Sequence, residues 1–254
     1  MVGQKNNLNQ VITWKMNRNL PRFILIVGEM GSGRLTLAKA ISKTIHCNLA
    51  IVGNSVEDVR QTIRASYTVA DTTMYIFRNI DDMRKEAMNA LLKITEEPPN
   101  KAYFVATAER AENVLETILN RATVIYMQPY TKAEIKAESN GKISDLKYID
   151  TIGELKQWEQ DGGHDKFIDF VAEVAKNLNT MYGTDVLQIS KKLKCKDTEN
   201  GYDCIQFIKT LYKMLPVNRD VSRLTTQCIN DLHRAGVKKS STVDLYLLEV
   251  RNYI

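Results

Sequence analysis

The sequence predicts a parallel α/β domain, a small helical lid and an all-helical C-terminal part. Short apolar runs without alternation are typical of strands in a sheet that helices cover on both faces. These runs alternate with amphipathic helical stretches along the first half of the chain, and they stop after Pro129. We therefore expect boundaries at 1–130, 131–162 and 163–254, with Asp161-Gly162-Gly163 as the linker.

Each element follows from its own pattern. A helix that carries Leu8, Val11 and Ile12 precedes the first strand. Apolar runs predict strands at 23–27, 49–52, 74–77, 103–107 and 123–127. Helical spacing predicts the intervening helices at about 34–46, 56–66, 87–95 and 112–121. The lid is expected to be helical over 131–160, and four apolar sets predict later helices over 167–178, 204–215, 221–232 and 243–254.

The turn after the first strand has the form of a phosphate-binding loop. In such loops, backbone N–H groups and a helix N-terminus surround phosphates. The complete motif adds a Lys and a Ser or Thr for Mg²⁺, and here Arg34 and Leu35 stand in those positions. The candidate nucleotide-binding residues of this degenerate loop are Gly28, Gly31, Ser32, Gly33, Arg34 and Thr36. Binding of ATP or ADP stays open, and no metal is expected.

A hydrolytic site of this type also needs carboxylates at the end of a second strand. Arg78 and Asn79 follow the strand at 74–77, and the acidic pair Asp81-Asp82 comes later. We expect this pair to lie too far along the chain to face the loop. It is better placed to cap the next helix.

Charge and cysteine content limit the remaining classes. The net charge of +5 permits contact with phosphate backbones without requiring it. The basic run 191–196 is either a solvated helix end or a contact for nucleic acid or an acidic partner. The four cysteines and three histidines lack metal-site spacing, so reduced thiols and no zinc are expected. With no apolar run of ~20 residues and no secretory signal, a cytoplasmic protein without a membrane segment is expected.

The segment Asn89-Ala90-Leu91-Leu92-Lys93-Ile94-Thr95-Glu96-Glu97-Pro98-Pro99 resembles the bacterial clamp-loader AAA+ family, in which an NALLK helix runs into EEPP. The segment 115–122 is similar to that family's TI-x-SRC motif, with Asn120 and Ala122 in place of Ser and Cys. The resemblance also takes in 19–22 and 57–60 and covers about 8–130. The simpler alternative is an ordinary helix that ends at two prolines, which would account for this segment without any family relationship. However, acids at a helix C-terminus are unfavourable, which favours cations from a neighbour as partners of Glu96 and Glu97.

Departures from the family pattern indicate which member the chain is most like. Arg34, Leu35, Arg78 and Asn79 replace catalytic groups, whereas Arg121 is retained. This combination resembles the delta-prime subunit of the bacterial or phage DNA polymerase III clamp loader. The resemblance implies an AAA+-like domain with a collar-like helical bundle, no intrinsic ATP hydrolysis and no required cofactor. A further departure is that the interval after Cys47 has no room for the family's four-cysteine zinc module, so no zinc is expected.

The partners implied are the other subunits of a hetero-oligomeric ring, primed DNA and, indirectly, the sliding clamp. Arg121 would act in trans as an arginine finger at a neighbour's ATP site; the simpler alternative is a cation that complements its own helix end. Either Thr107 or Glu109 is the candidate sensor near a γ-phosphate, and 152–155 takes the place of a second sensor arginine. Two other functions stay open. One is a divergent AAA+ ATPase in which Asp81 or Asp82 supplies the carboxylate, and the other is a non-replicative AAA+-like adaptor.

Overall fold

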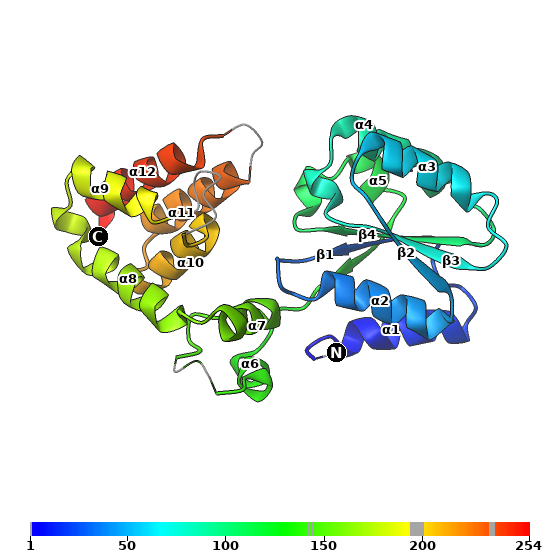
Figure 1. The fold of residues 1–254 in the computed structure, drawn as a ribbon, viewed down its shortest axis with the longest axis horizontal. Helices are drawn as coiled ribbons and strands as arrows, with labels where there is room; N and C mark the ends of the chain where they lie inside the picture. Colours follow the sequence, from blue (N-terminus) through cyan, green and yellow to red (C-terminus); the bar gives the residue numbers. More distant parts are fainter. Residues whose placement is uncertain (1, 142, 144, 194–200, 234–236) are drawn as a thin grey trace. The chain divides into compact units, whose positions relative to one another are not determined.

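The computed structural model describes residues 2–141, 143, 145–193, 201–233 and 237–254 (Figure 1). The chain forms two compact units. The first contains 1–140 and 149–157, and the second contains 141–148 and 158–254. The three-part division at residues 130 and 162 stays a prediction.

The first unit is built on one five-stranded sheet, and every strand pair in it is parallel. The strand order is β2-β3-β4-β1-β5, which places β1 between β4 and β5. The strands are β1 (Phe23–Val27), β2 (Asn48–Val52), β3 (Thr73–Phe77), β4 (Ala102–Ala108) and β5 (Thr123–Tyr126). The predicted parallel α/β fold is confirmed.

Helices cover both faces of the sheet (Figure 1). One face packs on α1 (Lys5–Met16) and α2 (Arg34–Ile45), and the other on α3 (Val56–Ser66), α4 (Lys85–Glu96) and α5 (Glu116–Leu119). Side chains of a strand point alternately to the two faces. All five residues of β1 are therefore buried, with Ile24 and Ile26 in one core and Phe23, Leu25 and Val27 in the other.

The prediction of a single helix over 112–121 is wrong. The segment forms a short 3₁₀ turn (η2, Ala111–Asn113) and then the four-residue helix α5. Between them Val114 and Leu115 adopt extended backbone angles, and the side chain of Val114 is buried in the sheet core. Burial of Val114 interrupts the helix, because a continuous helix would present a different face to the sheet. A second 3₁₀ turn, η1 (Ile80–Asp82), follows β3.

The regular elements of the rest of the described chain are helices. The lid region contains α6 (Lys132–Glu138) and α7 (Ile152–Asp161), and 139–151 between them is not helical where it is described. The second unit contains α8 (His164–Asn177), η3 (Leu178–Thr180), α9 (Gly183–Lys191), α10 (Cys204–Met214), α11 (Arg219–Leu232), α12 (Lys239–Val250) and η4 (Arg251–Tyr253). Helix α9 was not predicted, because its nine residues carry only a short apolar pattern.

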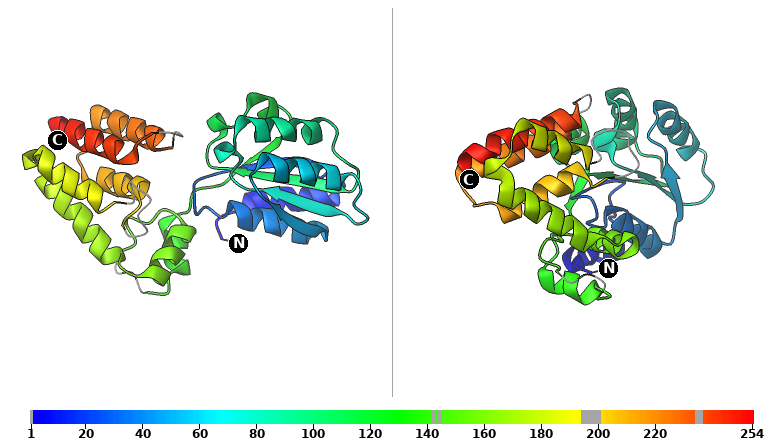
Figure 2. Two further views of the ribbon diagram at one scale, coloured as in Figure 1. Left: turned by 45° about the horizontal axis from the view of Figure 1, so that its top comes forward. Right: turned by 60° about the vertical axis from the view of Figure 1, so that its left-hand side comes forward.

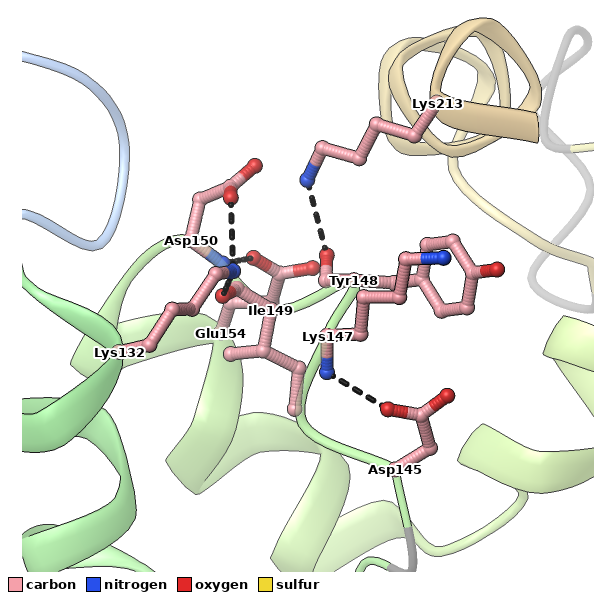
Figure 3. A network of polar contacts seen from close by, with 8 residues as sticks. All are labelled: Lys132, Asp145, Lys147, Tyr148, Ile149, Asp150, Glu154 and Lys213. Atoms are coloured by element: carbon pink, nitrogen blue, oxygen red, sulfur yellow. Dashed lines mark hydrogen bonds and ion pairs between the residues drawn. The ribbon is translucent and has the colours of Figure 1, made fainter. Parts of the chain in front are cut away.

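The helices of the second unit share one apolar core, and two further views show them gathered into a bundle (Figure 2). Phe167, Phe207 and Leu211 lie at its centre with almost no exposed surface. The loop before α7 joins this unit through a hydrogen bond of 3.2 Å from Lys213 Nζ to the carbonyl oxygen of Tyr148 (Figure 3). No helix among the described residues is long and apolar enough to cross a bilayer.

Side-chain caps fix several helix starts. Ser55, Asp203 and Asn218 each accept a hydrogen bond from a backbone N–H in the first turn of the helix that follows. Thr131 and Glu134 form a reciprocal capping box at α6. Each such cap stabilises its helix by about 1 kcal/mol. The helix starts are therefore local properties of the sequence.

Candidate functional site

The glycine-rich turn connects β1 directly to α2. Gly28 closes the strand, and its N–H donates to the carbonyl oxygen of Ala108 at 3.1 Å. Gly31 and Gly33 have φ angles of 81° and 92°, in the left-handed region that favours glycine. Gly33 is the N-cap of α2, and Arg34 is its first residue. The predicted strand–turn–helix geometry of a phosphate-binding loop is therefore present.

The sheet order brings three further residues to the same edge. β3 and β4 lie beside one another, β4 lies beside β1, and all three strands end at that edge because they are parallel. Arg78 and Asn79 follow β3, and Thr107 lies near the end of β4. The N–H of Asn79 donates to Thr107 Oγ1 at 3.0 Å. Thr107, one of the two sensor candidates, thus holds the turn after β3.

A pocket of about 610 Å³ opens over this edge. Four predicted site residues line it, namely Gly31, Gly33, Arg34 and Thr36. Other lining residues include Leu35, Arg78, Asn79, Thr107, Tyr130, Glu138 and Lys156. The lining combines three cationic side chains with one carboxylate, so an anion is the class of ligand it could hold.

Gly28 and Ser32 were also predicted as nucleotide-binding residues. They belong to the loop but are not part of the pocket lining. Ser32 is buried, and its carbonyl oxygen accepts a hydrogen bond of 2.8 Å from the Tyr130 hydroxyl. Its own Oγ is buried without a hydrogen-bond partner. A Cβ atom at Gly28 would overlap Met127. These two positions are therefore set by packing.

Arg34 occupies the position of the missing lysine in a largely buried setting. Burial lowers the pKa of the Arg34 guanidinium, and the nearby carboxylates of Glu109, Asp81 and Asp82 partly oppose this shift. Its Nη1 atom is buried without a hydrogen-bond partner. A buried cation without full hydrogen bonding is unfavourable, so the surrounding acids compensate for the burial of its charge.

Neither Asp81 nor Asp82 is part of the pocket lining. Their carboxylates nevertheless oppose the lowering of the Arg34 pKa that burial causes. The N-cap of α4 is Arg84, so the prediction that Asp81 caps this helix is wrong. Asp81 Oδ2 instead accepts from the backbone N–H groups of Glu109 and Arg110 at 2.8 and 3.1 Å. The 3₁₀ turn over Ile80–Asp82 folds the acids back to the end of β4.

The residues of this pocket do not fit Mg²⁺. The metal requires oxygen ligands in a near-octahedral arrangement. The position of the usual hydroxyl ligand carries the apolar Leu35, and the residue directly after β3 is the cation Arg78. Arg34 adds a second positive charge to the same lining. No step of a metal-assisted hydrolysis can therefore be assigned to this pocket.

Helix α7 packs directly on the glycine-rich turn. The N–H of Gly153 donates to the carbonyl oxygen of Gly31 at 3.0 Å. The start of α7 is held in turn by Lys132, which donates to the carbonyl oxygen of Ile149 at 2.6 Å and pairs with Asp150 at 3.3 Å (Figure 3). Gly153 therefore contacts the loop, and Lys156, one helical turn further along α7, adds a cation to the pocket lining.

We expect Gly153→Ala to destabilise the first unit by about 2 kcal/mol through overpacking. A Cβ atom there would overlap the backbone of Gly31, which cannot turn aside as a flexible side chain could. Alanine's higher helix propensity offsets at most about 1 kcal/mol of this cost. The measurement is urea unfolding combined with hydrogen exchange of 28–36 and 149–157.

Gly183→Ala is the matched control. Gly183 opens α9 and needs no left-handed backbone, and a Cβ atom added there would meet nothing within 4 Å. The substitution should leave stability unchanged or slightly raised. Equal stability of the two variants would contradict the contact between α7 and the loop.

Arg121 lies away from the pocket, directly after α5. Its Nη1 donates to the carbonyl oxygen of Thr117 at 2.9 Å, and its Nη2 pairs with Glu96 Oε1 at 2.9 Å. The first contact is the one that the helix-end alternative predicts. The second provides Glu96 with a cation from its own chain, so the expectation that this acid needs a neighbour for its partner is wrong.

Other predicted features lie outside this pocket. Lys192 lies 5.1 Å from the Phe170 ring centre at the end of α9, whereas 194–196 of the basic run falls outside the described residues. Cys47, Cys204 and Cys228 take part in no disulfide, and Cys195 also falls outside the described residues. In the described part of the chain, no group of three or more His, Cys, Asp or Glu is arranged to hold a metal ion.

Tyr130, Gly153 and Lys156 are among the residues of this region that the sequence did not predict as site residues. Tyr130 gives no signal, because an isolated tyrosine after a strand has many roles. Gly153 breaks an otherwise helical pattern, and such a glycine indicates a close backbone approach. Lys156 follows Gly153 by three residues, which places it one helical turn further along α7.

Comparisons with known proteins agree with this geometry. The family described as "DNA polymerase III, delta subunit" matches residues 48–131. DNA polymerase III subunit gamma of Buchnera aphidicola subsp. Baizongia pistaciae is 22% identical, over 82% of this chain and 69% of that protein. Subunit tau of Bacillus subtilis is 21% identical, over 90% of this chain but only 48% of its own length.

A solved structure supports the fold as a whole. The DNA polymerase III gamma subunit-related protein of Thermotoga maritima superposes with a TM-score of 0.52 at 18% identity. The match covers 96% of this chain and 99% of that one. Together with the loop geometry and the parallel sheet, these matches show that the chain is similar in sequence to DNA polymerase III clamp-loader subunits and shares their fold.

Proposed function

We propose that this protein is a non-hydrolysing clamp-loader subunit of the delta-prime type. In this role it holds its place in a hetero-oligomeric ring that sets the sliding clamp on primed DNA. Its own contribution to chemistry is Arg121, an arginine finger that enters the ATP site of a neighbouring subunit. The relatives named above are gamma, tau and delta subunits, so the choice among family members rests on the site residues.

The observation that carries this proposal is the composition of the pocket. Arg34, Leu35 and Arg78 stand where an ATPase needs a lysine, a hydroxyl and a carboxylate. A γ-phosphate there would meet the broader fork of a guanidinium in place of a compact ammonium. The three cations of the lining could still take a phosphate group without metal. Binding of ATP or ADP is therefore compatible with the proposal, whereas hydrolysis is not.

The position of Arg121 supports the second half of the proposal. Its side chain is 40% exposed and lies outside the chain's own pocket. Within its own domain its guanidinium contacts Thr117 and Glu96. An arginine supplied in trans stabilises the charge that develops in phosphoryl transfer.

The direct test is ATP hydrolysis by the purified chain with Mg²⁺. We expect no turnover above background, and Arg34→Lys should restore none, because the hydroxyl and carboxylate ligands are still missing. A clamp-loader ATPase subunit assayed in parallel shows that the conditions support hydrolysis. Steady turnover that Asp82→Asn abolishes would instead indicate the divergent ATPase.

The adaptor alternative is separated by partner identification. Affinity capture of the tagged chain from its native cells, followed by mass spectrometry, should recover clamp-loader subunits in stoichiometric amounts. Recovery of a stable complex without replication subunits would favour the adaptor.

A further inference from the structure

We propose that Glu96 is a positioning residue for Arg121, holding the guanidinium ready before it meets a phosphate. This inference rests on the proposed function of Arg121 as a finger in trans. It joins two motifs that are separate in the sequence, the EEPP segment and the segment similar to TI-x-SRC. In the structure their charged residues lie in contact.

The guanidinium is held at both terminal nitrogens. Nη2 pairs with Glu96 Oε1 and Nη1 donates to the carbonyl oxygen of Thr117, each at 2.9 Å. The two anchors come from different elements, since Glu96 is the last residue of α4 and Thr117 lies in α5. Contacts in two directions define the plane of the group, which one contact would not.

Stability alone does not account for Glu96. A carboxylate at a helix C-terminus is disfavoured by the helix dipole. The ion pair is half-exposed, with 53% of the Glu96 side chain and 40% of the Arg121 side chain accessible, and exposed pairs contribute little to stability. A need to fix the orientation of the Arg121 guanidinium explains why a carboxylate stands at this helix end.

Pre-orientation has a defined kinetic consequence. A free arginine side chain loses rotamer entropy when it is immobilised at a phosphate. Here the Arg121 side chain has already lost this entropy when the chain folds. A guanidinium has five N–H donors, and the two contacts use two of them, which leaves three for a phosphate. An orienting residue therefore raises kcat at the neighbour's site without changing how tightly that site binds ATP.

The test uses the reconstituted clamp loader with Glu96→Ala in this subunit. We expect kcat at the neighbouring ATP site to fall roughly tenfold, while KM for ATP and assembly of the ring stay unchanged. The effect is smaller than complete loss of Arg121, because the Thr117 contact still holds one end. Glu96→Gln should recover most of the rate, since its amide oxygen can accept the same hydrogen bond.

Glu97→Ala is the matched control. It removes the same charge one residue further on, and its carboxylate makes no ion pair with Arg121. We expect no change in kcat from Glu97→Ala. An equal loss in the two alanine variants would mean that the charge of the segment, and not the hold on Arg121, sets the rate.

The two single variants and the double variant together separate this inference from the proposed function. If Arg121→Ala leaves the rate unchanged, the finger itself is refuted. If Arg121→Ala slows hydrolysis but Glu96→Ala does not, only the positioning role is refuted. In an Arg121→Ala background, Glu96→Ala should cause no further loss, because its effect acts through the arginine. A further loss there, or a faster rate in Glu96→Ala alone, would also overturn the proposal.

Discussion

Replacing Arg121 with alanine is expected to slow ATP hydrolysis at the neighbouring site of the assembled clamp loader by roughly 10³-fold. An arginine finger supplied in trans contributes ~10³–10⁵ to the rate of phosphoryl transfer. The chain itself should stay folded, because the substitution removes only an exposed ion pair and one hydrogen bond to a carbonyl. Circular dichroism and co-purification of the ring check that expectation.

The site that receives Arg121 must be measured alone. A ring in which the other ATPase subunits carry a P-loop lysine-to-alanine change leaves one active site, and single-turnover kinetics then report its chemical step. Arg121→Lys serves as the charge-preserving comparison and should restore only part of the rate, because an ammonium lacks the fork of the guanidinium. An unchanged rate in Arg121→Ala would leave the residue as a cation that caps the end of α5.

A chain that ends at Gly163 is expected to lose co-purification with the other clamp-loader subunits completely, while its α/β part stays folded. Helices α8 to α12 form a core of their own, and large apolar side chains remain exposed outside it, among them Tyr182, Leu187 and Leu245. Under the proposed function the chain acts by contacting the hydrolytic site of a neighbour, so a heterologous ring-type interface is expected. The alternative is a self-contained bundle without an assembly role.

The fragment needs one adjustment and a companion experiment. Trp158 stacks on Phe167, so Trp158→Gln in the fragment keeps a large exposed ring from causing aggregation. In the full chain, Leu187→Asp and Leu245→Asp should weaken co-purification without unfolding, because these side chains are 53% and 57% exposed. Full retention of partner binding by the fragment would rule out assembly through the helical unit.

Much of the fold could be predicted because it is determined locally. The unalternating apolar runs determined the five strands, and their alternation with helices determined that the sheet is parallel. The glycine-rich loop and the replacement of its usual Lys and Ser or Thr could also be predicted, since Arg34 and Leu35 directly follow the glycines in sequence. Family resemblance followed from short motifs in the right order.

Tertiary structure alone decided the contacts between segments that are distant in the chain. The path of the 3₁₀ turn after β3 brought Asp81 to the backbone N–H groups after β4, and the docking of α7 brought Gly153 onto Gly31. The ends of α4 and α5 meet on one face of the sheet, which pairs Glu96 with Arg121. Periodicity determines which face of an element is buried, but it carries no information on which distant side chains the strand order brings together.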